Sequence, residues 1–404
     1  MAGQIGARLT FAFVLCAFPF LLTSTAAAQQ SEPVAYDGQR LSGQPTQTQA
    51  AFSAAWGDKA AQEWASEHTH ALINAQLAAL GLKPSFRTVY PDLPPDPADT
   101  TPVQLQTTTT NAPAIGDLID IDQQAHLMYV GNGNADAIEV FDVSTSTPRW
   151  VRAFHVPGGV AGILIAPDLK KVFGGSPNGM VIVDADPNSA TYGATLNTIY
   201  LGPGGTDELD YDPVDHKVYV TDVADQTVAS VDAIHNTLIK AFPNLPETQL
   251  EQPRYNPGDG FMYMSWRATN QIAKFDPRSD TLVSVTPVGV PCTPSGIAIK
   301  PTTNLAMIGC RPQIVFWDLK TNSMVSASPK SGGADQVIYN AHADRFFAAG
   351  SGYHRGPVMG IFDGSGNFIT NIPTTSVSHE VGYDQTNGIV YTIGGGLIWF
   401  KPPV

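Results

Sequence analysis

The chain has 404 residues and a formal net charge of −14, with 36 acidic and 22 basic side chains. A chain this acidic repels nucleic acid phosphates and anionic lipid headgroups, which argues against binding to nucleic acid or to a membrane surface. Charged residues make up only 14% of it, whereas it has 37 glycines and 32 prolines, a composition typical of short strands joined by tight turns.

The first 28 residues are predicted to be a signal peptide. Arg8 is their only charged side chain, the apolar stretch "LTFAFVLCAFPFLLT" follows it, and "AAA" at 26–28 offers a cleavage site. An apolar run of about 15 residues is too short to cross a bilayer, which needs roughly 20. We therefore expect a periplasmic or secreted protein with no membrane span after processing.

The chain up to residue 102 is predicted to contain three different segments. Residues 29–46 are polar and expected to be flexible, and residues 83–102 form a Pro-rich linker. Residues 47–82 are predicted to be a helical extension, because four apolar side chains recur there every four residues, namely Phe52, Trp56, Ala60 and Trp64. We expect this apolar stripe to pack against the side or bottom of the following domain, and a partner-binding face is the alternative.

From about residue 103 the chain consists of seven similar units. Each unit opens with two alternating apolar runs joined by a short polar turn, as in "LDYDPVDHKVYVT". The units begin at residues 119, 163, 209, 253, 297, 337 and 381, in steps of 40 to 46 residues. A third run ends in aspartate in six units, at Asp142, Asp184, Asp232, Asp276, Asp318 and Asp363. We expect these aspartates to form turns by accepting backbone N–H groups two residues on, rather than to act in catalysis.

Four strands per unit, repeated seven times, predict an all-β fold, a seven-bladed β-propeller over residues 103–404 with a short helical N-terminal extension. The seventh unit ends at "GLIWFKPPV", after only three strands. The segment "VQLQTTTT" at 103–110 is predicted to supply the missing strand. An N-terminal strand in the last blade would close the ring and protect two sheet edges.

The amino-acid sequence of the units resembles that of a known family. "VYVTD" at 218–222, followed by "QTVASVDAIHNTLIKAF", resembles the bacterial YVTN β-propeller repeat, with Asp222 in place of the usual asparagine. The resemblance covers residues from about 103 to 404 and is looser in the other units, for example "MYVGN" and "MYMSW". It implies an exported seven-bladed propeller, and it says little about chemistry because the members mostly bind ligands or are uncharacterised.

Two cysteines remain once the signal peptide, with its Cys16, is removed. An even pair in an exported protein predicts a disulfide between Cys292 and Cys310. Cys292 precedes the innermost strand of the fifth blade and Cys310 ends the next strand, so a hairpin would bring both to one face.

The predicted functional site is the central channel, on the face with the loops that enter each innermost strand. Acidic residues precede these strands in five of the seven units, and one unit adds a histidine. Four are predicted ligands for a hard divalent cation such as Ca²⁺, namely Asp117, Glu208, Glu251 and Asp335. His379 and Glu380 are the catalytic candidates beside it. The alternative is an acidic, hydrated funnel without a bound ion.

The loops between the second and third strands open on the same face. They supply six predicted ligand-binding residues, namely Trp266, Arg267, Arg311, Tyr353, His354 and Arg355. Arginine and aromatic side chains over an acidic channel would suit a polar or aromatic ligand that carries some negative charge. The alternative is that the arginines are merely solvated.

Three functions remain open at this point. The first is a monomeric exported protein that binds a small molecule or a protein partner at the channel face. The second is a metal-assisted hydrolase or lyase on the same scaffold, similar to propeller lactonases and streptogramin lyases. The third is a redox subunit resembling the heavy chain of methylamine dehydrogenase. The chain lacks G-x-S-x-G, H-E-x-x-H, C-x-x-C and phosphate-loop motifs, which favours the binding function.

Overall fold

The computed structural model describes residues 95–108, 118–132, 135–222, 225–247, 249–353, 355–375 and 378–403. The predicted signal peptide, flexible segment and helical extension lie outside the described residues, as does the first part of the linker. Within these ranges no helix has the length and apolar character needed to cross a membrane.

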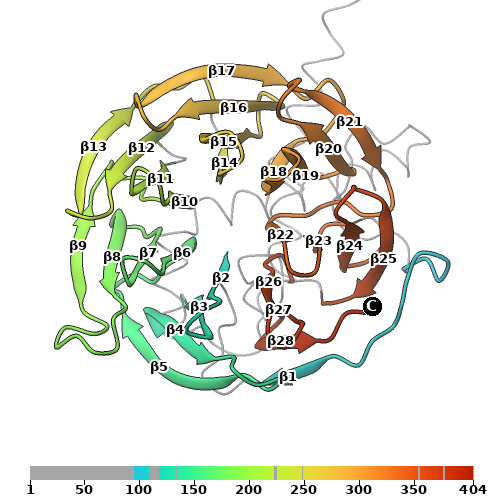
Figure 1. Cartoon of the computed structure of the whole chain (residues 1–404), viewed down its shortest axis with the longest axis horizontal. Coiled ribbons are helices and arrows are strands. Elements are labelled where there is room, and N and C mark those ends of the chain that lie inside the picture. Colours follow the sequence, from blue (N-terminus) through green and yellow to red (C-terminus); the bar gives the residue numbers. More distant parts are fainter. Residues whose placement is uncertain are drawn as a thin grey trace, which may run out of the picture.

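Seven four-stranded antiparallel sheets surround a central channel like the blades of a propeller (Figure 1). Blades one to four contain β2 (Ile119–Asp122), β3 (Leu127–Asn132), β4 (Ala137–Asp142) and β5 (Arg149–His155); β6 (Ile163–Ala166), β7 (Lys171–Gly174), β8 (Met180–Asp184) and β9 (Thr195–Ile199); β10 (Leu209–Asp212), β11 (Lys217–Asp222), β12 (Thr227–Asp232) and β13 (Thr237–Phe242); and β14 (Leu250–Asn256), β15 (Phe261–Trp266), β16 (Gln271–Asp276) and β17 (Thr281–Pro287). Blades five to seven contain β18 (Pro294–Lys300), β19 (Leu305–Cys310), β20 (Ile314–Asp318) and β21 (Ser323–Ser328); β22 (Val337–Asn340), β23 (Arg345–Gly350), β24 (Val358–Asp363) and β25 (Phe368–Pro373); and β26 (Gly382–Asp384), β27 (Ile389–Ile393) and β28 (Leu397–Phe400) with β1 (Gln106–Thr108). The predicted all-β, seven-bladed fold is confirmed.

The outer strand of blade seven is β1, which comes from the N-terminal side of the ring (Figure 1). It pairs antiparallel with β28, with Gln106 opposite Trp399 and Thr108 opposite Leu397. The residues before β1 run along blade six, where Thr100 forms a parallel bridge to Asn371. The ring is therefore closed by strands from both ends of the propeller sequence.

The turn between the first and second strands has the same backbone feature in every blade. Each such turn holds one residue with φ between 48° and 75°, namely His126, Lys170, His216, Gly260, Asn304, Asp344 and Gly388. Gly, Asn and Asp adopt this left-handed region most readily, and the seven turns use them in four cases. A constant turn geometry gives the seven hairpins the same register, so equivalent residues reach equivalent places in the ring.

The six aspartates that end the third strands form turns, as predicted. In each case a carboxylate oxygen accepts the backbone N–H of the residue two positions on, at 2.8 to 3.1 Å. These residues lie between the third and outer strands, away from the channel. Their repeated occurrence thus reflects local folding rather than chemistry.

The hydrophobic core lies between the blades. One cluster joins Ile138 and Val140 of blade one to Val172 and Val183 of blade two, all buried. Similar clusters join the other neighbouring blades around the ring. Because both faces of each sheet pack against a neighbour, the innermost strands are held in fixed positions around the channel.

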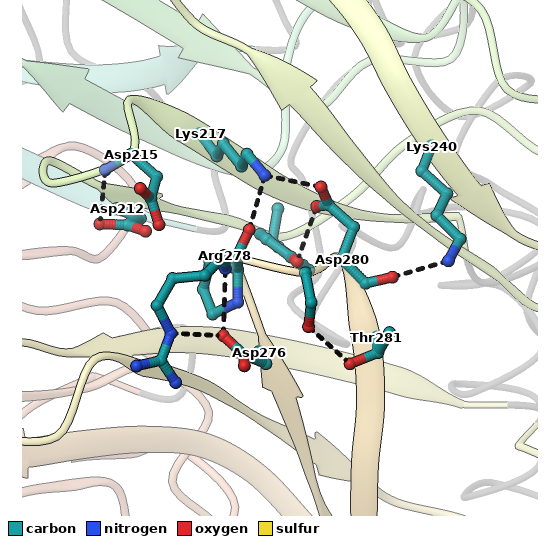
Figure 2. Close-up of polar contacts among 11 residues, drawn as sticks. Asp212, Asp215, Lys217, Lys240, Asp276, Arg278, Asp280 and Thr281 are labelled. Carbon is teal, nitrogen blue, oxygen red and sulfur yellow. Dashed lines mark hydrogen bonds and ion pairs between the residues drawn. The ribbon is translucent and has the colours of Figure 1, made fainter.

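A polar network links blades three and four near their outer strands (Figure 2). Lys217 Nζ lies 2.6 Å from Asp280 Oδ2 and 2.5 Å from the carbonyl oxygen of Pro277. The hydroxyl of Tyr219 donates to Asp280 Oδ1 at 3.1 Å, and Lys240 Nζ donates to the Asp280 carbonyl oxygen at 2.7 Å. The Lys217 and Asp280 side chains are only 14% and 12% exposed. Lysine at the start of β11 thus ties one blade to a turn of the next.

The predicted disulfide between Cys292 and Cys310 is confirmed, since the pair lies at bonding distance with its Cα atoms 4.5 Å apart. It joins the loop entering β18 to the end of β19, and both residues are buried. The backbone N–H of Cys292 donates to Asn270 Oδ1 at 3.1 Å, which connects this loop to blade four.

Reducing this disulfide is expected to lower the free energy of unfolding by about 3 kcal/mol, because the unfolded chain regains the entropy of an open loop. Urea unfolding with and without reductant measures the change. A double variant, Cys292→Ser with Cys310→Ser, is the control and should not respond to reductant. Two free thiols in unreduced peptides by mass spectrometry would contradict the prediction.

Candidate functional site

Three acidic side chains meet at the mouth of the channel, where the chain enters the innermost strands. Glu208 directly precedes β10, Glu251 lies near the start of β14, and Asp335 precedes β22. One carboxylate oxygen from each lies within 4.8 Å of the other two. Glu208 and Glu251 are almost fully buried, whereas the Asp335 side chain is 29% exposed. We call these three residues the mouth cluster.

Arg267 lies among these acids rather than above them. It directly follows β15 and is only 5% exposed. Its Nη1 is 2.9 Å from Glu251 Oε1, and its Nη2 is 3.2 Å from Asp335 Oδ1 and also donates to the Ser295 hydroxyl. One guanidinium therefore neutralises part of the charge of the mouth cluster, and the four side chains together carry a formal charge of −2.

The residue after each of two mouth acids fixes the acid in place. Gln252 Oε1 accepts the backbone N–H of Ile297 in the next blade at 3.1 Å. Gln336, which precedes blade six, contacts blades seven and one. Its Oε1 accepts the N–H of Val381 at 2.7 Å and its Nε2 donates to the Ile119 carbonyl at 3.0 Å. These glutamines tie neighbouring inner strands together, so the carboxylates beside them are positioned by the ring itself.

His379 and Glu380 lie at the same mouth, separated by Val381 from β26, the innermost strand of blade seven. His379 Nε2 is 3.2 Å from Glu380 Oε1, and both side chains are nearly buried. The His379 carbonyl oxygen accepts the backbone N–H of Gln336, which places the pair next to the blade that carries Asp335.

Two of the predicted ligand-binding aromatic residues are buried. Trp266 is 1% exposed and packs in the core between blades three and four, near Leu250 and Tyr255. Tyr353 is 4% exposed, and its hydroxyl donates to the Pro329 carbonyl oxygen at 2.9 Å. We therefore propose packing roles for both side chains.

Two of the other predicted ligand-binding residues, Arg311 and Arg355, have different surroundings. The backbone N–H of Arg311 donates to the Cys292 carbonyl at 2.9 Å, so Arg311 lies beside the disulfide. Arg355 lies 3.6 Å from Asp96, in the segment that runs along blade six. Asp117 and His354 lie outside the described residues. Among the described residues, Arg267 forms ion pairs with two acids of the mouth cluster, Glu251 and Asp335.

A second set of charged side chains, Asp120, Asp210 and Arg254, lies farther along the innermost strands, at the second position of their repeat units. Asp210 Oδ1 pairs with Arg254 at 3.0 Å, and its Oδ2 accepts the backbone N–H of Tyr255 at 2.6 Å. Asp120 Oδ2 accepts the N–H of Ile165 in blade two at 2.9 Å. Burial raises the pKa of Asp210 and raises that of Asp120 to about 6. The sequence analysis did not identify this set.

The fold is similar to known structures. A chain in the crystal structure of a mitotic checkpoint complex matches with a TM-score of 0.61 and 15% identity, over 79% of this chain and 98% of that chain. The structure of U3-55K matches with a TM-score of 0.58 and 9% identity, over 76% and 100% of the two chains. No protein-family model and no curated protein matches the sequence. At such low identities these similarities define a β-propeller fold and nothing about the ligand.

Proposed function

We propose that this protein is a binding protein whose channel mouth receives a positively charged group, with a divalent cation such as Ca²⁺ as the first candidate. The observation that supports it is the convergence of Glu208, Glu251 and Asp335 within 4.8 Å. Like charges this close repel one another, and Arg267 brings one positive charge among the three carboxylates. A cation at the mouth would reduce this repulsion.

The donor atoms suit a hard cation. Carboxylate oxygens are the side-chain ligands that Ca²⁺ prefers, and six or more oxygens usually complete its shell. The formal charge of −2 on the mouth cluster with Arg267 equals the charge that one divalent cation neutralises. Glu208 and Glu251 would be ligands, with Asp335, the most exposed of the three acids, facing solvent or a bound partner.

Adding CaCl₂ is expected to raise the melting temperature, because a ligand that binds only the folded state stabilises it by mass action. At a concentration one hundred times Kd the gain is about 2.7 kcal/mol, or roughly 5 °C for a domain of this size. Glu208→Gln should abolish most of this rise, since it removes one carboxylate and leaves the Arg267 ion pairs with Glu251 and Asp335 in place. Differential scanning calorimetry at constant ionic strength measures both effects.

Two further variants sharpen this experiment. Glu251→Gln should also reduce the calcium effect, although it weakens an ion pair to Arg267 at the same time. Asp232→Asn is the matched control, because Asp232 accepts the backbone N–H of Ile234 in a turn far from the mouth and should leave the response unchanged. A melting temperature that changes with neither calcium nor chelator would contradict the cation site. The mouth would then be an electrostatic funnel.

A metal-assisted hydrolase or lyase is the second candidate. The His379–Glu380 pair at 3.2 Å favours it, because a histidine oriented by a carboxylate can act as a general base beside a cation. Calcium-dependent turnover of lactones or esters, lost in His379→Gln with calcium binding retained, would support this candidate over pure binding.

The setting of the protein is part of the proposal. The predicted signal peptide and the disulfide support a periplasmic or secreted protein, since disulfides persist in oxidising compartments. We propose that it acts as a monomer, that it belongs among the YVTN-type propellers, and that its partners are small molecules or proteins rather than nucleic acid.

A further inference from the structure

A cavity of about 190 Å³ lies in the central channel, deeper than the mouth. Its walls come from the innermost strands of blades one, four, five, six and seven, so it lies on the axis of the ring rather than between two blades. Such a volume has room for about six water molecules at roughly 30 Å³ each. It is too small for most cofactors and suits a small organic molecule.

The cavity has apolar walls and a few polar groups. The hydrocarbon surface comes from Ile119, Ile121, Ala298, Ile338 and Val381. The polar side chains are those of Asp120, Gln123, Arg254, Tyr339, Asn340 and Tyr383. A ligand that matches this lining needs a hydrocarbon part and one polar end.

The charge of the lining and its neighbours determines whether the polar end of the ligand is positive or negative. Arg254 is committed to other partners, because its Nη1 pairs with Asp210 at 3.0 Å and its Nε donates to the Ile297 carbonyl at 3.2 Å. Asp120 accepts the backbone N–H groups of Ile121 and Ile165 at 2.8 and 2.9 Å, neither of which carries a charge. Asp120, Asp210 and Arg254 together carry a formal charge of −1, which disfavours an anion.

We propose that this cavity binds a small primary amine, with the ammonium group at the Asp120 carboxylate and the hydrocarbon part against Ile121, Ala298 and Ile338. A single carboxylate beside an arginine is a poor site for a metal ion, which needs several oxygen ligands. An ammonium group, in contrast, can be held by one carboxylate and a few neutral acceptors. This site is separate from the mouth and does not depend on the function proposed for it.

Titration of the full chain with butylammonium chloride tests the proposal, followed by calorimetry and by saturation-transfer NMR. Butylammonium is expected to bind at pH 7.5, and butanoate of the same shape is not. Asp120→Asn should weaken binding at least tenfold, because it removes the charge from the hydrogen bond to the ammonium. Ile338→Phe should weaken it by filling the cavity, and it tests the site independently if Asp120→Asn fails to fold.

Two controls separate this site from other acidic surfaces. Asp122 lies two residues after Asp120 in β2, outside the cavity lining. Asp122→Asn should therefore leave butylammonium binding unchanged. Glu208→Gln at the mouth should also leave it unchanged, so failure of the mouth proposal and failure of this one are distinguishable. Affinity should fall as the pH drops below about 6, where the carboxylate of Asp120 gains a proton and loses its charge. The other charged side chain of the lining, Arg254, is paired with Asp210 just outside it. Absence of saturation transfer to butylammonium would overturn the proposal. Affinities in Asp120→Asn and Ile338→Phe equal to that of the unsubstituted protein would overturn it as well.

Discussion

Deleting residues 29–112 is expected to give insoluble protein, because the ring then lacks the outer strand of blade seven. Without β1 the backbone groups of β28 that pair with Gln106–Thr108 are exposed as an open sheet edge. The same deletion removes Asp99 and its 2.8 Å ion pair with Lys330, and the bridge from Thr100 to Asn371. Blade seven loses its closure and blade six loses its covering segment at once.

Expression yield in the soluble fraction and size-exclusion chromatography measure this effect. Deleting only residues 29–46 is the control, and it should leave the protein soluble because it retains every described contact of the ring. A soluble, cooperatively folding fragment of residues 113–404 would show that closure by β1 is dispensable.

Asp280→Asn is expected to lower the free energy of unfolding by about 3 kcal/mol (Figure 2). The substitution keeps the shape of the side chain and suits the left-handed backbone at this position, where φ is 50°. It removes the negative charge that faces Lys217 Nζ at 2.6 Å. A buried ammonium group is then left without its counter-charge, which is costly.

Asp276→Asn is the matched control for Asp280→Asn, since Asp276 pairs with the exposed Arg278 in the same turn (Figure 2). Exposed ion pairs contribute about 0 to 1 kcal/mol, so this variant should change stability little. Urea unfolding of both variants measures the difference. Adding Lys217→Met to Asp280→Asn should recover part of the loss, because the uncompensated charge is then gone. Equal unfolding free energies for the two single variants would contradict the proposed role of this ion pair.

Much of the fold is predictable from the sequence because the architecture is a repeat. Seven units of similar length, all with the same turn and six of them with the same terminal aspartate, leave little freedom in the number of blades. The mouth cluster is predictable in outline for the same reason. Glu208, Glu251 and Asp335 lie at or just before the start of equivalent strands, and equivalent strands surround one axis.

The partners of individual side chains are not predictable in the same way. Trp266 and Arg267 are consecutive, but the end of β15 places the first in the core and the second among the mouth acids. The loop sequence "SWRATN" contains no signal for that division. The charged residues farther along the innermost strands, in contrast, could have been found by comparing the units with one another. Asp120, Asp210 and Arg254 occupy a repeat position where other units have Leu164, Ala298, Ile338 and Gly382.

The pairing of Gln106 with Trp399 also sets a time course for the nascent chain. These residues are 293 positions apart, and a ribosome adds about 5 to 20 residues per second, so β1 waits roughly 15 to 60 s for its partner to be made. During that interval six blades can form their local hairpins, whereas the contact of longest range forms last. The open edges of this intermediate are the surfaces that a chaperone would need to cover.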